Sequence, residues 1–272
     1  MQDQVMERKE LLETNRKAWN GLVAKGNRWT VPVDSAAIEK ARAGTPEIVL
    51  TPQKLVPKEW FPKLAGCKTL LLAGGGGQQA PLMAAAGAEV TVVDLSERQL
   101  EQDQVVARRE GLSIRSIQSS MDDLSDLEDA SFDLVIHPCS NSFVPDINPV
   151  WREAARVTRS GGVMMAGFCN PLLFLFDEEV AEKEGLKVSF ALPYSDQHSL
   201  PAERSEVLLK AGEPLMFGHT LEDQIGGQLR AGFSVTHMFE DSWGKESGEF
   251  EFALQELDRY TKSFIATRAV RA

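Results

Sequence analysis

A run of four glycines, Gly74 to Gly77, is the part of this sequence whose residue types point most directly to ligand binding. It follows the apolar stretch Leu70–Ala73 and precedes two amides, Gln78 and Gln79. Glycine has no Cβ, so the chain can turn sharply there and bring its backbone close to a ligand. A helix that starts after such a turn presents free N–H groups to a polar ligand. A plain tight turn is the alternative for this run taken by itself.

Asp94 supplies a second polar group in a related position, at the end of the β-branched run 89–93. An acid at the end of a second strand can accept hydrogen bonds from both hydroxyls of a ribose lying over the first turn. The alternative is an aspartate that starts the turn into a helix capped by Ser96. Two cofactors with a ribose fit these features. NAD matches through the loose pattern Gly75-x-Gly77-x-x-Ala80, and S-adenosylmethionine needs no pyrophosphate site.

The elements that position these groups alternate between strand and helix. Apolar and β-branched runs predict strands at 69–72, 89–93, 114–119, 132–137 and 163–169. Helical spacing predicts helices from Ser96, where Gln99 completes a capping-box spacing, and at 148–158, ending before Ser160-Gly161-Gly162. Strands joined by helices indicate right-handed βαβ units and a parallel sheet covered on both faces. Ligands of such sheets bind at the carboxyl ends of the strands.

The chain divides into four expected parts around this sheet. Residues 1–64 predict a helical and irregular cover, because helical spacing gives way to a series of prolines. Residues 65–170 are the expected cofactor-binding core, and residues 171–218, where regular patterning lapses, are an expected substrate-covering insertion. Residues 219–272 are expected to complete the core with a helix from Thr220 and two strands, 233–239 and 263–270.

Composition narrows the classes of partner. The formal net charge is −11 with a pI of about 5.0, which disfavours a nucleic-acid partner. The charged start of the chain and the shortness of its apolar runs predict a cytoplasmic protein without a membrane partner. Cys67, Cys139 and Cys169 have no CxxC spacing, so we expect reduced thiols and no metal site.

Four degenerate motifs follow one another in a specific order. The glycine turn comes first, then the acid after the second strand, a polar segment at 120–124, and the sequence FDLVI at 132–136 ahead of a GG turn. With these motifs, residues 66–170 resemble the class I S-adenosylmethionine-dependent methyltransferases, specifically those with the ubiquinone/menaquinone-biosynthesis type of domain. The resemblance implies an α/β, Rossmann-like, seven-stranded and mostly parallel sheet with helices on both faces and a C-terminal antiparallel hairpin.

The resemblance also implies S-adenosyl-L-methionine as the cofactor, S-adenosyl-L-homocysteine as the product, and roles for individual residues. The glycines are implied to lie against the methionine part, Asp94 to bind the ribose, and Leu95 with Met121 and Asp122 to flank the adenine. His137 is implied to face the methionine end. The cofactor-binding positions expected from this comparison are Ala73, Gly74, Gly75, Gly76, Gln78, Gln79, Asp94, Leu95, Gln99, Ser120, Met121, Asp122 and His137.

This sequence departs from the family pattern at three places. Leu72 stands where the family commonly has an acid, Gln78 replaces the third glycine, and Ser120 replaces an acid on the adenine side. Amide side chains can donate and accept hydrogen bonds. We therefore expect Gln78 and Gln79 to supply replacement hydrogen bonds to the cofactor.

Candidate residues for the reaction follow from the same comparison. Methyl transfer from a sulfonium needs a general base only when the acceptor holds a proton. His137 is the expected catalytic residue, because histidine titrates near neutrality; a histidine bonded within its own loop is the alternative. Asn141 after the fourth strand and Tyr194 and His198 in the insertion are expected to touch the substrate. Four aromatic residues of the cover are expected either to close over an apolar molecule or to pack in the core: Trp19, Trp29, Trp60 and Phe61.

The sequence thus predicts an enzyme of class EC 2.1.1 that methylates an unidentified small molecule by in-line displacement. We expect a monomer or a homodimer. Two other classes stay open at this point. One is an NAD-type nucleotide-dependent oxidoreductase, and the other is a non-catalytic regulatory protein that binds S-adenosylmethionine.

Overall fold

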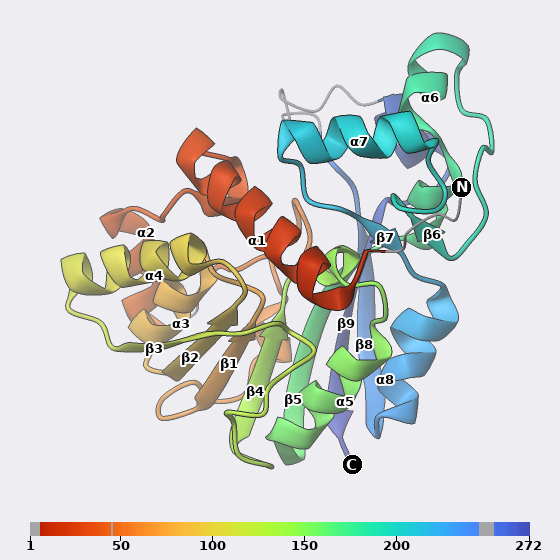
Figure 1. The fold of residues 1–272 in the computed structure, drawn as a ribbon. Coiled ribbons are helices and arrows are strands. Elements are labelled where there is room, and N and C mark those ends of the chain that lie inside the picture. Colours follow the sequence, from red (N-terminus) through yellow and green to blue (C-terminus); the bar gives the residue numbers. More distant parts are fainter. Residues whose placement is uncertain (1–5, 45, 245–252) are drawn as a thin grey trace.

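The computed structural model describes residues 6–44, 46–244 and 253–272. Residues 1–5 and 45 of the expected cover, and 245–252 of the expected C-terminal part, lie outside these ranges. A seven-stranded sheet with the order β3-β2-β1-β4-β5-β9-β8 forms the middle of the fold (Figure 1). Its strands are β1 (Lys68–Leu72), β2 (Glu89–Asp94), β3 (Ile114–Gln118), β4 (Phe132–His137), β5 (Thr158–Cys169), β8 (Phe233–Asp241) and β9 (Phe264–Arg271).

The sheet is parallel from β3 to β5, and β9 runs antiparallel between β5 and β8. This confirms the expected mostly parallel sheet with a C-terminal antiparallel hairpin. Strand β1 shows why both faces are covered: Leu71 packs into one apolar cluster, while Leu70 and Leu72 pack into the other. Successive side chains of a strand point to opposite faces, so a wholly apolar strand requires a layer on each side.

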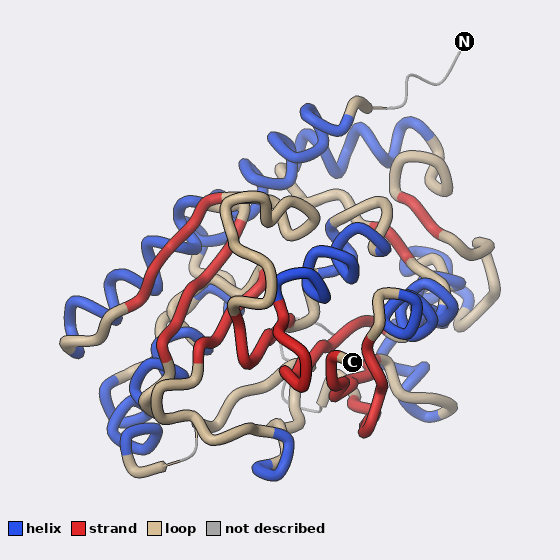
Figure 2. The backbone as a smooth tube through the Cα atoms, turned by 90° about the horizontal axis from the view of Figure 1, so that it is seen from below, coloured by secondary structure: helices blue, strands red, loops and turns tan. Residues whose placement is uncertain are grey.

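Helices supply these two layers, and Figure 2 shows them on both sides of the strands. The cluster around Leu71 includes side chains of α2 (Ser35–Arg42), α3 (Gln79–Ala85) and α4 (Glu97–Glu110). The cluster around Leu70 and Leu72 includes side chains of α5 (Asn148–Val157). The π-helical segment η5 (Glu222–Gly226) and α8 (Gly227–Arg230) follow one another, and α8 packs beside α5.

The expected caps form at Ser96 and Thr220, but Gln99 does not complete a capping box, because the Ser96 N–H donates to Asp94 instead. The Ser96 hydroxyl accepts a hydrogen bond from the Gln99 N–H at 3.1 Å and starts α4. Gly111 ends that helix in the left-handed conformation. Thr220 and Asp223 form a reciprocal cap, because each side chain bonds the backbone N–H of the other.

Two expectations on local structure were wrong. Strand β5 begins at Thr158 instead of 163, and residues 159–162 form an irregularity within it, where Gly161 has a φ of 74°. The insertion contains the helices α6 (Glu178–Glu184) and α7 (Ala202–Ala211). No residue of α7 is buried, so its sequence lacks the apolar periodicity that reveals a helix. The short segments η4 (Pro171–Leu175), β6 (Tyr194–Ser195) and β7 (Phe217–Gly218) complete the insertion.

The N-terminal cover lies across the carboxyl-end edge of the sheet. Helix α1 (Arg8–Lys25) packs on α4, and the short turns η1 (Arg28–Thr30) and η2 (Lys58–Trp60) follow it. Asn15 ties α1 to two other parts of the chain: its amide donates to the Phe143 and Leu215 carbonyls, and its oxygen accepts from the Leu215 N–H at 2.8 Å. The remaining turns are η3 (Asn141–Phe143) and η6 (Ala253–Arg259). Among the described ranges no helix combines the length and apolarity needed to cross a bilayer.

Candidate active site

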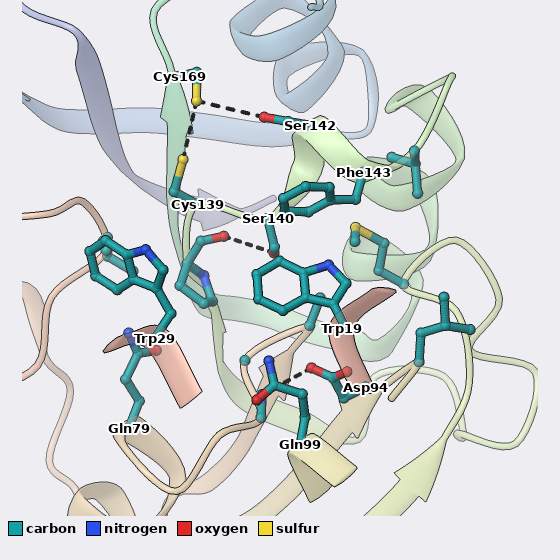
Figure 3. A pocket seen from close by; sticks show the side chains of 18 of the residues that line it. Trp19, Trp29, Gln79, Asp94, Gln99, Cys139, Ser140, Ser142, Phe143 and Cys169 are labelled. Atoms are coloured by element: carbon teal, nitrogen blue, oxygen red, sulfur yellow. Dashed lines mark hydrogen bonds between the residues drawn. The ribbon is translucent and has the colours of Figure 1, made fainter. Parts of the chain in front are cut away.

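A cavity of about 230 Å³ lies at the carboxyl ends of β1 to β5, beneath α1 (Figure 3). Each of these strands contributes a residue at or just beyond its end, and most of the other lining residues come from the cover, the start of α4, the loop after β4, the insertion and the C-terminal part. Its lining comprises Leu12, Asn15, Trp19, Trp29, Val49, Leu50, Thr51, Pro52, Ala73, Gly74, Gly75, Gln78, Gln79, Asp94, Leu95, Gln99, Ser120, Met121, Pro138, Cys139, Ser140, Ser142, Phe143, Val144, Cys169, Met216, Trp243 and Phe264. The position is the one that the parallel sheet predicts for a ligand.

The structure brings most of the predicted cofactor positions together in this cavity. Those that line it are Ala73, Gly74, Gly75, Gln78, Gln79, Asp94, Leu95, Gln99, Ser120 and Met121. They come from the ends of three adjacent strands and the start of α4. Gly76, Asp122, His137, Asn141, Tyr194 and His198 are not part of the lining.

Asp94 is the carboxylate of this lining, and backbone groups fix its orientation. Its two oxygens accept hydrogen bonds from the Gly75 N–H at 3.1 Å and the Ser96 N–H at 2.9 Å. Burial raises the pKa of Asp94 from 3.8 to about 6, against the lowering effect of these two bonds. A carboxylate oxygen has two acceptor sites, so each oxygen can still accept a hydroxyl from the cavity.

The glycine turn is shaped by the segment that covers it. Gly76 has a φ of 119°, and a Cβ there would lie 2.7 Å from the Trp29 carbonyl oxygen. The next residue, Gly77, accepts a hydrogen bond from the Val33 N–H at 2.9 Å and donates one to the buried Asp103 carboxylate at 2.9 Å. The glycines thus allow the backbone of the cover to lie directly on the turn. Gly76 serves this contact and not the cavity wall.

The two glutamines after the turn hold the cover as well. Gln78 donates both amide hydrogens to backbone carbonyls, of Arg28 at 2.8 Å and Val31 at 3.0 Å. Gln79 donates to the Val49 carbonyl, and its own oxygen is buried with no hydrogen-bond partner among the described residues. The side-chain oxygen of Gln99 is buried and unpartnered within the same ranges. Two such acceptors in a cavity lining fit a ligand with amine or hydroxyl donors, as a nucleoside cofactor has.

His137 does not reach the cavity, which corrects its expected catalytic role. It is fully buried, its Nδ1 lies 2.9 Å from the Leu72 carbonyl oxygen, and its ring packs edge-on against Trp151 of α5 at 5.7 Å. Burial lowers its pKa to about 4, so the ring is neutral at physiological pH. Trp151 belongs to the helix layer that covers one face of β4, and it does not line the cavity. We therefore leave His137 out of the proposed site.

The three expected substrate contacts also have other roles. Asn141 is fully buried and donates to the Gln224 side chain at 2.7 Å, and its carbonyl lies 3.0 Å from the Nε2 of His219. The Tyr194 hydroxyl donates to Asp196 at 2.7 Å inside the insertion. His198 is exposed on a turn. None of the three residues lines the cavity, and the Asn141 side-chain oxygen is buried without a hydrogen-bond partner among the described residues.

Asp122 lies next to the lining and is used locally. Its carboxylate accepts a hydrogen bond from the Ser120 hydroxyl and forms an ion pair with Arg8 at 2.9 Å. The pair joins the start of α1 to the loop after β3. We therefore assign Asp122 to the attachment of the cover.

Apart from Trp19, one end of the cavity consists of residues for which the sequence predicted no role in the site. Pro138, Cys139 and Ser140 follow β4, and Cys169 ends β5. Trp19 of α1 meets Phe143 edge-on with ring centroids 5.0 Å apart, and both rings line the cavity. We call this region, with Met216, Val144 and Phe264, the acceptor end. Position at or close to the carboxyl end of a strand is the signal that could have identified Cys139 and Cys169.

The cavity lining contains few side chains that can carry a charge. Among its described residues there is no lysine, arginine or histidine, and Asp94 is the one carboxylate. Cys139 and Cys169 are the other two groups that ionise. Of the four aromatic residues expected to cover an apolar molecule or pack in the core, Trp60 and Phe61 pack in the core, whereas Trp19 and Trp29 line the cavity. The acceptor end therefore offers apolar and neutral surface to whatever enters it.

Comparisons with known proteins bear on this site. A family model described as a methyltransferase domain matches residues 70–166, from β1 to β5. The chain is 48% identical over 261 residues to a protein of Bacillus subtilis (strain 168) named "Uncharacterized methyltransferase YbaJ", covering 96% of this chain and 98% of that protein. It is 29% identical over 164 residues, 55% of this chain and 68% of the other, to the "Ubiquinone biosynthesis O-methyltransferase" of Bordetella avium (strain 197N).

Solved structures agree on the architecture. A putative S-adenosylmethionine-dependent methyltransferase from Listeria monocytogenes superposes with a TM-score of 0.58 at 17% identity, over 79% of this chain and 94% of that one. At that level of identity the likeness concerns the fold.

Proposed function

Because this chain belongs to the class I S-adenosylmethionine-dependent methyltransferases, we propose that it methylates an uncharged, largely apolar small molecule at the cavity beneath α1. S-adenosylmethionine is the cofactor, so the NAD-dependent alternative is set aside. The observation that carries the proposal is the composition of the acceptor end, which joins aromatic rings to thiols and lacks cationic side chains among the described residues.

We assign the cofactor to the part of the cavity formed by the ends of β1 to β3. Asp94 is proposed to accept the two ribose hydroxyls, and the buried oxygens of Gln79 and Gln99 to accept donors of the same ligand. Leu95 and Met121 supply apolar surface for the adenine. Ala73 to Gly75 line the wall that leads from the ribose toward the acceptor end.

When bound, S-adenosylmethionine supplies a methyl group on a sulfonium, which a nucleophile displaces in line. The residues of the acceptor end orient the acceptor and exclude water, and positioning of this kind supplies much of the acceleration. No histidine or lysine in the described lining accepts a proton. The proposed acceptor therefore loses its proton easily or has none on the attacking atom.

The four-part division of the chain is retained in this proposal. Residues 1–64 contribute Trp19 and Trp29 to the cavity, and the insertion 171–218 contributes Met216. The cover and the insertion would then select the acceptor, while residues 65–170 bind the cofactor.

A transfer assay with methyl-tritiated S-adenosylmethionine tests the proposal. The panel contains neutral phenols and thiols, charged amines and amino acids, a protein mixture and a DNA oligonucleotide. We expect label in the solvent-extractable neutral products, suppressed by S-adenosylhomocysteine and unaffected by NAD. Label confined to amines, protein or DNA contradicts the proposed acceptor class. Tight binding of S-adenosylhomocysteine without transfer to any member favours the non-catalytic regulatory protein.

We expect Gln78→Ala to weaken binding of S-adenosylhomocysteine about tenfold, because two hydrogen bonds that hold residues 28–31 over the turn are lost. Calorimetry measures the change. Gln78→Glu is the matched control, since it keeps the length of the side chain and lacks the donors, and it should lose affinity similarly. An unchanged dissociation constant in both variants would remove Gln78 from the site.

The raised pKa of Asp94 predicts a pH dependence of cofactor binding. Below about pH 6 the carboxyl of the free protein is protonated, so hydroxyl binding must first expel a proton. The affinity for S-adenosylhomocysteine should rise with pH up to about 6 and then level off. Calorimetry from pH 5 to 8 measures it, and in Asp94→Asn this part of the dependence should vanish.

The contribution of Asp94 to the free energy of unfolding of the ligand-free protein should fall with rising pH, whereas the cofactor affinity should rise. The folded pKa of Asp94 lies above its unfolded value of 3.8, so its contribution is fully present below pH 3.8 and is lost as pH rises through about 6. The difference in unfolding temperature between the wild type and Asp94→Asn should shift in favour of the variant between pH 5 and 7. A difference that stays constant over this range contradicts the assignment.

A further inference from the structure

Two cysteines from adjacent strand ends face each other in the wall of the cavity. The Sγ atoms of Cys139 and Cys169 lie 3.6 Å apart, and Figure 3 shows the two thiols pointing toward one another. Both residues are partly exposed and both line the cavity. A small oxidant that enters the acceptor end therefore meets both sulfurs.

The backbone holds these cysteines in place. The Cys139 N–H donates to the Leu50 carbonyl at 3.0 Å, and Cys169 pairs with Phe264 in the antiparallel ladder of β5 and β9. A disulfide bond is about 2.05 Å long, so the sulfurs must approach by about 1.5 Å. Because these bonds hold both backbones, the approach must come from rotation of the two short side chains.

The two thiols differ in reactivity. Hydrogen bonds from Cys139 and from the Ser142 hydroxyl, whose oxygen lies 3.6 Å from the Cys169 sulfur, lower the pKa of Cys169. Interaction with that sulfur, together with burial, raises the pKa of Cys139. Cys169 is thus the thiol that ionises first, and a thiolate is the species that oxidants attack.

We propose that Cys139 and Cys169 are a reversible disulfide site through which hydroperoxides change the acceptor end of the cavity. The Cys169 thiolate attacks a peroxide oxygen and becomes a sulfenic acid, with one molecule of water formed as the leaving oxygen takes up protons. The Cys139 sulfur then attacks that sulfur, and a second water leaves. Overall, two thiols and one hydrogen peroxide give one disulfide and two waters, and a dithiol reductant reverses the change.

Differential alkylation with mass spectrometry tests the site on the full chain and needs no acceptor. After brief treatment with hydrogen peroxide, unreacted thiols are blocked with iodoacetamide under denaturing conditions. We expect a disulfide-linked peptide pair containing Cys139 and Cys169, full alkylation of both after dithiothreitol, and an alkylated Cys67 throughout. Cys67 is the matched control, because it is buried just before the start of β1 and does not line the cavity.

Variants separate this pairing from unspecific oxidation. In Cys139→Ser, Cys169 should stop at the sulfenic acid and become labelled by dimedone, while Cys67→Ser should still form the disulfide. Recovery of Cys139 and Cys169 as two alkylated thiols after peroxide, or linkage of either to Cys67, would overturn the proposal. These results stand or fall separately from the transfer assay.

The functional consequence rests on the proposed function. With an acceptor identified by label transfer, peroxide should lower the initial rate at least tenfold and dithiothreitol should restore it. The dissociation constant of S-adenosylhomocysteine should change by less than threefold, since Asp94 and Gln99 belong to the other end of the cavity. An unchanged rate in protein that carries the disulfide contradicts a role in controlling acceptor access.

Discussion

Asp94→Ala is expected to raise the dissociation constant of S-adenosylhomocysteine by at least ~100-fold at pH 7.5. Hydrogen bonds to a charged group contribute about 1.5–3 kcal/mol each, and the proposed site loses two of them. Calorimetry measures the loss directly. The same change should lower the rate of label transfer at a fixed, limiting concentration of S-adenosylmethionine.

Controls for this variant separate binding from folding. Asp94 also accepts hydrogen bonds from the Gly75 and Ser96 N–H groups, so its removal disturbs the start of α4. Ser96→Ala is the matched control, because it removes the cap of the same helix and leaves the carboxylate in place. We expect it to lower stability by about 1 kcal/mol with little loss of affinity. Equal losses of affinity in the two variants would contradict a direct role for Asp94.

Gly76→Ala is expected to destabilise the protein by about 3 kcal/mol and to reduce cofactor affinity at least tenfold. A φ of 119° is open to glycine and strained for alanine. The added Cβ would also lie 2.7 Å from the Trp29 carbonyl oxygen and 3.0 Å from the Gln99 side-chain oxygen. The segment around Trp29 must therefore move away from the glycine turn. Trp29 and Gly75 both line the cavity, so this movement disturbs the site. Chemical denaturation and calorimetry give the two quantities.

Gly111→Ala is the control for backbone strain alone. Gly111 has a φ of 67° at the end of α4, and nothing lies within 4 Å of its hypothetical Cβ. Its substitution should cost about 1 kcal/mol and leave cofactor affinity unchanged. If Gly76→Ala behaves in the same way, the contact between the turn and the cover does not shape the site.

The sheet was predictable because its central strands are apolar on both faces, while the edge strands β3 and β8 still carry β-branched and apolar residues among polar ones. All seven strands were expected within a few residues, apart from the early start of β5. The irregularity at residues 159–162 explains that difference, since the glycines bend a strand there without ending it. The cap at Ser96 and the acid at Asp94 were predictable for a similar reason: both follow from local spacing.

The role of His137 was not predictable from its position alone. Side chains of β4 alternate between the two faces, and His137 falls in step with Val135, which packs into the cluster that includes Trp151 of α5. The carboxyl end of a strand thus lies beside the cavity while its last side chain points into a core. To tell a side chain in the cavity from one in the core, one must know which helix layer that position of β4 faces.

The cover and its contacts required the structure. The Asn141 side chain bonds Gln224, 83 residues away, and Asn15 bonds Leu215, 200 residues away. Pairings across such separations leave no periodic signal in a single sequence. The same is true of Gln78: its side chain was expected to bond the cofactor, and the structure instead shows its amide donating to the carbonyls of Arg28 and Val31.

The crystal structure of the complex with S-adenosylhomocysteine tests the central claim most directly. We predict the ligand in the cavity beneath α1, with both ribose hydroxyls hydrogen-bonded to the Asp94 carboxylate. Its sulfur should face the acceptor end, formed by Trp19, Phe143, Cys139 and Cys169. A ligand whose ribose lies away from Asp94, or whose sulfur points away from that end, would contradict the account.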